Sequence, residues 1–222
     1  MDNRAQFERL LEGTRRLGIE VSAATLRQCL KLQEELLRWN RKVNLTAIVD
    51  PDQVLEKHLL DSLAAGSFVP ETGRLIDLGA GAGFPSIPLA LYRERLEVVA
   101  VDAVGKKVGF IKHASAQLGL GRRLIALHRR AEGDPEKETI PRGDVVISRA
   151  LMDLGKWLSL ARHYTGEVGR VVAMLGRKFS AEEIAAAARD AGAELDRTIT
   201  FALPFSGAER TIVSFRWHVG KV

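Results

Sequence analysis

The sequence predicts an α/β fold with a mostly parallel sheet, preceded by a helical N-terminal extension. From residue 73 onward, short apolar runs alternate with helix-like segments of about 10–15 residues, which is typical of a doubly wound parallel sheet. Before residue 73, apolar residues recur only at helical spacing. A glycine-rich turn, "DLGAGAGFPSIPLA" (77–90), connects the first apolar run to a helix, as nucleotide-binding folds do.

The N-terminal part is expected to be helical throughout. Three segments show helical spacing of apolar residues: 6–18, 23–40 and 52–66. Ser22 is a favourable N-cap for the second helix. Asp50 followed by Pro51 predicts the start of the third, as an N-cap and a proline in the first helical position.

The second part is expected to alternate strands and helices. The predicted strands are 74–80, 97–102, 123–128, 144–150, 169–175, 194–203 and 210–219. The predicted helices are 86–95, 104–119, 152–164 and 180–192, the last with Ser180 as its N-cap. Because no helix separates the last two strands, we expect them to pair antiparallel at or near a sheet edge, so the last strand is antiparallel.

The segment "PETG" (70–73) is the expected boundary between a helical cap, residues 1–72, and a Rossmann-like domain, residues 73–222. The cap holds 10 basic and 11 acidic residues, whereas the second part holds 23 basic and 17 acidic. Basic pairs recur there at 122–123, 129–130 and 177–178. A polyanionic partner and an ordinary solvated surface explain this surplus equally well.

Composition excludes several classes of protein. Apolar residues make up 46% of the chain, which predicts a packed core. No apolar run approaches the roughly 18 residues that span a bilayer, and the N-terminus lacks the apolar stretch of a secretory signal. Cys29 is the one cysteine, so no internal disulfide can form, and it is expected in the core. These features favour a cytoplasmic protein without a membrane partner.

The glycine turn predicts a nucleotide site. Gly79, Gly81 and Gly83 allow a tight turn and a close approach of backbone to ligand. Asp102 ends the next predicted strand, where a carboxylate can accept both hydroxyls of a ribose. The chain has no phosphate-binding P-loop motif.

Further residues favour a methyl donor over a dinucleotide. Asp77, ahead of the glycines, disfavours a pyrophosphate but suits the amino group and sulfonium of S-adenosylmethionine. Glu132, after Ala131 and the third strand, could accept a hydrogen bond from an adenine amino group. Three alternatives remain open on these residues: a methyltransferase for small molecules or proteins, a dehydrogenase-like domain, and a nucleotide-binding module without chemistry.

The whole pattern resembles the bacterial 16S ribosomal RNA (guanine-N7)-methyltransferases, also called glucose-inhibited division protein B. The motifs that carry the resemblance span nearly the whole chain: "WNRKVNLTAI" (39–48), "HLLDSLAA" (58–65), "DLGAGAGFPSIPLA" (77–90), "VDAVGKKVGFIK" (101–112), "RRAE" (129–132), "ISRA" (147–150) and "ERTIVSF" (209–215). The first two motifs are more specific than the glycine loop, which alone indicates only a superfamily.

The resemblance implies a class I methyltransferase fold and methyl transfer from S-adenosylmethionine to guanine N7 of 16S rRNA, free or in the small ribosomal subunit. The cofactor residues it implies, with those of the glycine turn, are Gly79, Gly81, Gly83, Phe84, Asp102, Ala131, Glu132 and Arg149. We expect no metal and a monomer. The chain departs from the family at Ser86, where glycine is usual, and at Leu175, where lysine is frequent. Arg177 or Lys178 is the candidate replacement for that lysine.

Guanine N7 carries a lone pair and no proton, so its methylation needs no general base. Proximity and orientation can supply about 7–11 kcal/mol of the rate acceleration. Arginine is the usual partner of the guanine edge that presents O6 and N7. We therefore nominate Arg149 and Arg210 as catalytic residues. Asn44 joins them through the resemblance, although a turn stabilised by Asn44 and Thr46 explains the same residues.

Two further groups are assigned structural roles. His58 and Asp61 lie one helical turn apart. They could form an acid/base pair, but a buried hydrogen bond that holds the cap to the sheet is favoured. The three tryptophans, Trp39, Trp157 and Trp217, sit in apolar patterns and are expected in the core.

Overall fold

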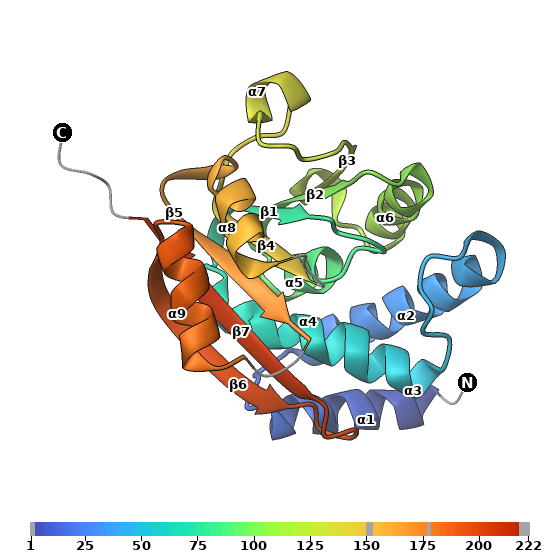
Figure 1. Ribbon diagram of the computed structural model, residues 1–222. Coiled ribbons are helices and arrows are strands. Elements are labelled where there is room, and N and C mark those ends of the chain that lie inside the picture. Colours follow the sequence, from blue (N-terminus) through green and yellow to red (C-terminus); the bar gives the residue numbers. More distant parts are fainter. Residues whose placement is uncertain (1–2, 150–152, 177–178, 218–222) are drawn as a thin grey trace.

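The computed structural model describes residues 3–149, 153–176 and 179–217 (Figure 1). Its N-terminal part consists of the helices α1 (Asn3–Arg16), α2 (Ala23–Val43), α3 (Pro51–Val54), η1 (Leu55–Leu60), α4 (Asp61–Ala64) and η2 (Ala65–Phe68). The predicted caps are confirmed: Ser22 accepts from the backbone N–H of Thr25, and Asp50 accepts from that of Gln53. Pro51 occupies the first turn of α3.

The predicted third helix is not uniform. Its middle segment, η1, is a π-helix, and its last turn, η2, is a 3-10 helix. The backbone N–H of Asp61 reaches back to the carbonyl of Glu56, one residue further than in an α-helix. Single π turns inside helices are frequently found at functional sites. Residues 56–61, which carry His58 and Asp61, therefore have a phase that sequence periodicity does not predict.

The second part is a seven-stranded sheet of order β3-β2-β1-β4-β5-β7-β6. Its strands are β1 (Thr72–Leu78), β2 (Arg95–Asp102), β3 (Leu124–His128), β4 (Gly143–Arg149), β5 (Thr165–Leu175), β6 (Glu194–Ala202) and β7 (Glu209–Arg216). The first five strands pair in parallel, and β7 is antiparallel to both β5 and β6. The predicted mostly parallel sheet and its antiparallel edge pair are confirmed.

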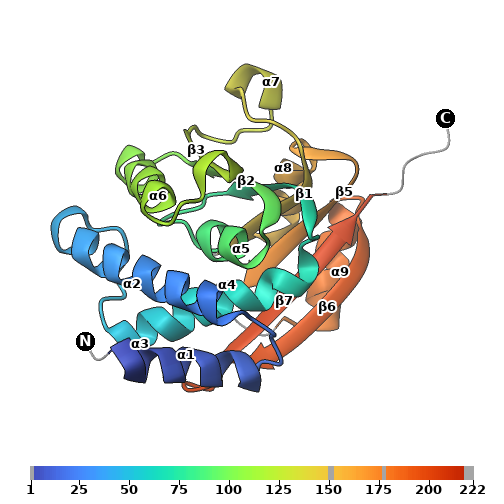
Figure 2. The ribbon, with the colours of Figure 1, turned by 180° about the vertical axis from the view of Figure 1, so that it is seen from behind.

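Helices cover both faces of the sheet (Figures 1 and 2). They are α5 (Ser86–Tyr92), α6 (Gly105–Gln117), η3 (Gly121–Arg123), α7 (Pro135–Glu138), α8 (Leu154–Arg162) and α9 (Ala181–Asp190). One face carries α5 and α6 with the cap against them, and the other carries α8 and α9. Ser180 forms a capping box with Glu183 at the start of α9. The short η3 and α7 were not predicted from the sequence.

The cap and the sheet share one hydrophobic cluster. It joins Leu36 of α2 and Leu59 of η1 to Ile87 of α5 and Phe110 of α6. Cys29 is fully buried in it, as predicted, and burial raises the pKa of its thiol to about 12. The division of the chain at 72/73 coincides with the start of β1 but stays a prediction about domains. In the described part of the chain, no helix is long and apolar enough to cross a membrane.

Candidate active site

The glycine turn follows β1 at the carboxyl end of the sheet. Gly79, Gly81 and Gly83 have φ values of 76°, 59° and 84°, in the left-handed region that favours glycine. The backbone N–H groups of Gly79 and Ala80 donate to the carbonyl of Val101 at 2.8 and 2.9 Å, which ties the turn to β2. A Cβ on Gly83 would come within 2.5 Å of the Ile87 side chain. A side chain at position 83 would therefore force Ile87 to move, in addition to straining the backbone.

Asp102 fixes the same turn from the end of β2. Its Oδ2 accepts from the N–H of Gly81 at 2.8 Å, and its Oδ1 accepts from the N–H of Val104 at 2.8 Å. The side chain is 6% exposed, so the carboxylate is held at the edge of the interior with lone pairs remaining for a ligand. The predicted contact of Asp102 with ribose hydroxyls stays a prediction.

A pocket opens beside this turn, which we call the glycine-loop pocket. It is lined by Leu78, Gly79, Val101, Asp102, Ala103, Arg129, Arg130, Ala131, Ser148, Arg149, Trp157 and Leu160. These residues include the carboxyl ends of β1, β2 and β4, where the strand order changes direction, and open α/β sheets bind ligands there. A Cβ on Gly79 would meet nothing within 4 Å, so its backbone faces open space. Trp157, expected in the core, is buried and forms one wall.

Asp77 does not stand at this pocket, which corrects the role assumed for it from the sequence. Its side chain is fully buried, and its Oδ2 accepts hydrogen bonds from both the N–H and the hydroxyl of Ser86. Burial raises the pKa of Asp77 to about 6, and the Ser86 bonds oppose that shift. The serine that replaces the family glycine thus anchors the start of α5 to β1.

Three other residues predicted to bind the cofactor, Ala131, Glu132 and Phe84, lie in different places relative to the glycine-loop pocket. Ala131 lines the glycine-loop pocket, but the Glu132 side chain is exposed and lies 4.0 Å from Arg130. Phe84 is buried under the turn, with its ring stacked on His58 at 4.7 Å between centroids. The structure therefore brings Ala131 to the pocket directly and leaves the roles of Glu132 and Phe84 as predictions.

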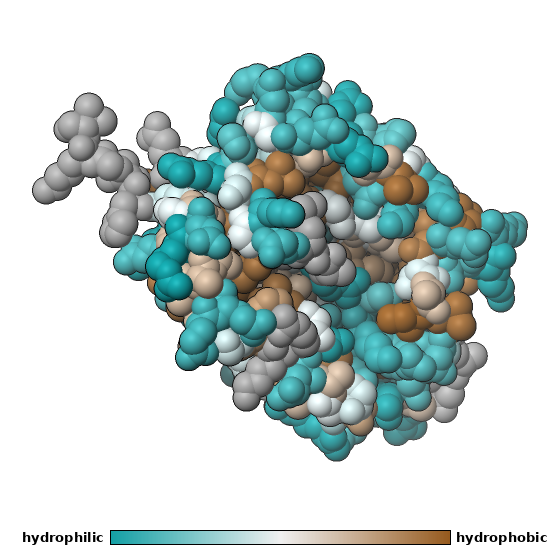
Figure 3. All heavy atoms as spheres, in the orientation of Figure 1, coloured by the Kyte–Doolittle hydropathy of each residue, from teal (hydrophilic) through white to brown (hydrophobic). Residues whose placement is uncertain are grey.

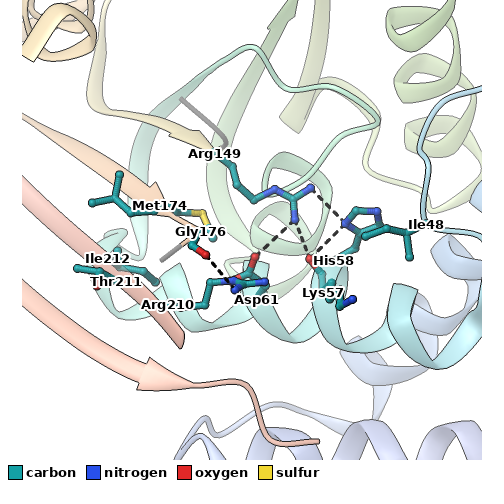
Figure 4. A pocket seen from close by; sticks show the side chains of 11 residues that line it. Ile48, Lys57, His58, Asp61, Arg149, Met174, Gly176, Arg210, Thr211 and Ile212 are labelled. Atoms are coloured by element: carbon teal, nitrogen blue, oxygen red, sulfur yellow. Dashed lines mark hydrogen bonds and ion pairs between the residues drawn. The ribbon is translucent and has the colours of Figure 1, made fainter. Parts of the chain in front are cut away.

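A second pocket adjoins the first, and we call it the arginine pocket (Figure 4). It is lined by Ile48, Lys57, His58, Asp61, Arg149, Met174, Leu175, Gly176, Arg210, Thr211 and Ile212. The face of the molecule shown in Figure 3 is hollowed near its centre. Arg149 lines both pockets, because it ends β4 between the glycine turn and the cap. Arg177 and Lys178, the candidate replacements for the family lysine, lie outside the described residues, as does Ala150.

Arg149 is held by the cap. Its Nη1 donates to the carbonyl of Lys57 at 2.8 Å and lies 3.6 Å from Asp61 Oδ2, while its Nη2 donates to His58 Nδ1 at 3.2 Å. Figure 4 shows these side chains converging from β4 and η1. His58 and Asp61 thus hold the cap to the sheet, as predicted, and the residue that they hold is Arg149.

Arg210 completes the cluster from the start of β7. Its Nε lies 3.4 Å from Asp61 Oδ1, and its Nη1 donates to the carbonyl of Glu209 at 2.9 Å. Asp61 therefore sits between two guanidinium groups. Burial raises the pKa of the Asp61 carboxyl, and the charges of Arg149 and Arg210 oppose that rise.

His58 is uncharged at neutral pH. Burial, followed by the charge of Arg149, lowers the pKa of its imidazole to about 3. Nδ1 lies 3.2 Å from both Arg149 Nη2 and the Lys57 carbonyl oxygen, and Nε2 lies 3.1 Å from Thr46 Oγ1. Both ring nitrogens are engaged, so His58 orients Arg149 and is not available as a base.

The predicted role of Asn44 is not evident in this geometry. Asn44 is exposed, ends α2 in the left-handed conformation with φ of 45°, and does not line the arginine pocket. The buried Asn40, which sequence reasoning missed, supports the turn instead: its Oδ1 accepts from the N–H groups of Leu45 and Thr46 at 2.6 and 2.9 Å. Contact between Asn44 and a base stays a prediction.

Glu56 is a second residue that sequence reasoning missed. It is 4% exposed, and its Oε1 accepts from the N–H groups of Phe205 and Ser206 at 2.6 and 2.8 Å. These bonds hold the β6–β7 turn, and with it Arg210, against η1. The sequence around Glu56 does not predict this contact, because Phe205 lies 149 residues further along the chain.

Solved structures show the class of protein that this fold and site define. A SAM-dependent methyltransferase from Aquifex aeolicus superposes with a TM-score of 0.57 at 18% identity, covering 75% of this chain and 93% of the other. The ribosomal protein L11 methylase of Lactobacillus delbrueckii subsp. bulgaricus gives 0.56 at 14% identity, covering 73% and 79%. The fold is that of a class I S-adenosylmethionine-dependent methyltransferase.

Sequence relatives narrow the class to a family. The family model described as rRNA small subunit methyltransferase G matches residues 25–213. The protein of that name from Myxococcus xanthus (strain DK1622) is 51% identical over 215 residues, covering 97% of this chain and 99% of the relative. That from Geobacter sulfurreducens is 39% identical over 206 residues, covering 92% and 94%. The chain belongs to the rRNA small subunit methyltransferase G family, which confirms the resemblance.

Proposed function

We propose that this chain moves a methyl group from S-adenosylmethionine to N7 of a guanine in small-subunit rRNA. Family membership supports a methyltransferase that acts on this RNA. The observation that carries the detailed proposal is that Arg149 lines both pockets. A donor in one pocket and an acceptor in the other would meet at this side chain.

The glycine-loop pocket fits S-adenosylmethionine, which when bound supplies an electrophilic methyl group on a sulfonium. Gly79 presents bare backbone to open space, and Asp102 offers carboxylate oxygens to ribose hydroxyls. Ala131 and the apolar walls formed by Val101 and Leu160 suit an adenine ring. Glu132 reaches the adenine only if it turns away from Arg130.

The arginine pocket suits a guanine. Its walls include Ile48, Met174 and Ile212, which can pack on a flat base, and its donors are the guanidinium groups of Arg149 and Arg210. Guanine presents O6 and N7 as acceptors on one edge. A single donated hydrogen bond to O6 orients the base and leaves the N7 lone pair free. Arg210 is the candidate for that bond, because Arg149 already donates to Lys57 and His58.

Isotope transfer tests the proposal. The protein is incubated with methyl-labelled S-adenosylmethionine and either small ribosomal subunits or naked rRNA from a strain that lacks this activity. We expect label in the rRNA, and digestion should release 7-methylguanine. Label only in proteins or small molecules, or at another position of the nucleotide, would contradict the proposal. The two substrates compared side by side also decide between free rRNA and the particle.

A further inference from the structure

An exposed apolar tip borders the arginine pocket. Ile48 is half-buried and lines that pocket, and Val49 beside it is 65% exposed. Hydrophobic atoms reach the surface over the segment between α2 and α3 (Figures 1 and 3). Among the exposed large apolar residues in the described ranges, Val49 is the one that adjoins a lining residue of the arginine pocket. A single exposed apolar residue is common on protein surfaces, and what distinguishes Val49 is that Ile48 beside it lines the arginine pocket.

The loop that carries Val49 is fixed at both ends. Before it, the Asn40 side chain accepts from the backbone of Leu45 and Thr46 and donates to the carbonyl of Thr46 at 2.9 Å. Thr46 Oγ1 accepts from the N–H of Ile48 at 3.1 Å. After it, Asp50 caps α3. The same Thr46 hydroxyl lies 3.1 Å from His58 Nε2, so the tip and Arg149 are connected through one imidazole.

Charges around the tip favour a nucleic acid over an apolar protein partner. Arg41 and Lys42 are exposed at the end of α2, and Lys57 lines the pocket. The nearest carboxylate along the chain, Asp50, accepts from the N–H of Gln53. Cations beside an apolar side chain match a strand whose phosphates are anionic and whose base faces are apolar.

A stacked guanine cannot enter a recessed pocket, so it must first lose its stacking on the neighbouring bases. Proteins that open base steps frequently insert an apolar side chain between them. We propose that Ile48 and Val49 form a wedge that packs against the nucleotide flanking the target guanine and keeps the target unstacked in the arginine pocket. This inference rests on the proposed function, because it assigns the handling of the same RNA substrate.

The chain offers a matched control. Val168 is 89% exposed on β5, whose other end, at Met174 and Leu175, lines the arginine pocket. It therefore lies toward the opposite end of the sheet. Three variants are compared with the wild type: Val49→Ser removes the apolar surface, Val49→Leu keeps it, and Val168→Ser makes the same chemical change away from the site. All are exposed, so each is expected to fold, and thermal unfolding verifies this.

The readouts are the single-turnover rate of methyl transfer to small-subunit rRNA and the affinity for S-adenosylmethionine without RNA. Val49→Ser removes the apolar contact with the flanking nucleotide and should slow transfer roughly tenfold, which corresponds to about 1.4 kcal/mol of activation free energy. Val49→Leu and Val168→Ser should stay near the wild-type rate, and cofactor affinity should not change in any variant. A structural role for Val49 would lower the unfolding temperature instead.

A second measurement addresses the wedge directly. In an rRNA that lacks the base of the flanking nucleotide, the target guanine has less stacking to lose. The defect of Val49→Ser should then shrink to less than threefold. Val49→Ser at the wild-type rate, or a defect unchanged by the abasic nucleotide, would overturn the wedge while the methyltransferase stands. Absence of label with the wild type would overturn the proposed function and the wedge with it.

Discussion

The two pockets that meet at Arg149 are built in different ways. The glycine-loop pocket is formed by the carboxyl ends of neighbouring parallel strands and the turns that follow them. The arginine pocket is formed where the cap meets β5 and β7, which are far from it in sequence. The first is a property of one local motif, whereas the second depends on correct docking of two parts of the chain. Substitutions in the glycine-loop pocket should therefore weaken binding of S-adenosylmethionine, whereas substitutions in the arginine pocket should mainly affect positioning of the guanine.

The largest effect is expected at the residue common to both pockets. Arg149→Ala removes a positioned donor and leaves His58 and the Lys57 carbonyl without their partner, so turnover on rRNA should fall about 100-fold or more. Cofactor affinity measured by calorimetry should fall much less. The exposed Arg142→Ala, which breaks only a surface ion pair with Glu136, is the control. Equal losses in turnover and cofactor affinity would place Arg149 in donor binding alone.

Asp102→Ala should weaken cofactor binding about 10–100-fold, since hydrogen bonds to a charged group are worth about 1.5–3 kcal/mol. Part of the loss arises from the glycine turn, because Asp102 also accepts from Gly81 and Val104. Asp102→Asn keeps one acceptor oxygen and should be intermediate. RNA affinity without cofactor should not change. A fall in RNA affinity would show that the two pockets are not separable.

Arg210→Ala should lower turnover roughly tenfold, less than Arg149→Ala, since Arg149, which lines both pockets, remains in place. Arg216 on the same strand is the matched control, because it forms ion pairs with Glu194 and Asp196 on the surface. Single-turnover kinetics and RNA-binding titrations provide the measurement. If Arg210→Ala keeps both turnover and RNA affinity, its assignment to the acceptor is wrong.

Lowering the pH should lower the free energy of unfolding through His58, which lines the arginine pocket. The folded-state pKa of His58 is about 3, below the ordinary histidine value of 6.5, so the unfolded chain binds more protons between these values. Stability from the neutral imidazole is complete above pH 6.5 and is lost as the pH falls toward 3. Between pH 7 and pH 5 the loss is about 2 kcal/mol. Denaturant unfolding of His58→Gln should show a smaller loss over this range, and equal losses would contradict the assigned burial.

The smallest effect is expected for substitutions of basic residues that could bind RNA phosphates. The pair 122–123 precedes β3, at the end of the sheet opposite the pockets, whereas 129–130 follows it. Arg130→Gln should lower the slope of log affinity against log salt by about one, and Arg122→Gln should leave it unchanged. Binding is measured without cofactor, because Arg130 lines the glycine-loop pocket. Equal slopes for both variants would leave the basic surplus as ordinary surface charge.

The glycine-loop pocket is built from one local motif and the arginine pocket from distant segments, and this difference explains which features the sequence predicted. Alternation of apolar runs, caps at Ser22 and Asp50, and glycines after a strand are local signals, and each predicted its element correctly. Asp102 could be placed because parallel strands end at one edge. The role predicted for Asp77 at the ligand was wrong, because a carboxylate before a glycine turn can equally well be buried. A hydrogen bond from Ser86 holds this carboxylate in the interior.

The arginine pocket was only partly predictable. Arg149 and Arg210 were found through resemblance and through guanine chemistry. Asn40 and Glu56 were missed, because their partners are backbone N–H groups, which carry no residue-specific signal. The π turn was missed because helical periodicity does not distinguish five-residue from four-residue hydrogen bonds over one turn.

That π turn makes the site sensitive to chain length. Deleting Leu59 would leave His58 and Asp61 two residues apart instead of three, and residues two apart do not share a face of a helix. His58 and Asp61 could not then both face Arg149, although both side chains would still be present. Deletion of this one residue is thus expected to be more damaging than many substitutions. Catalysis depends on the number of residues in this helix as well as on their side chains.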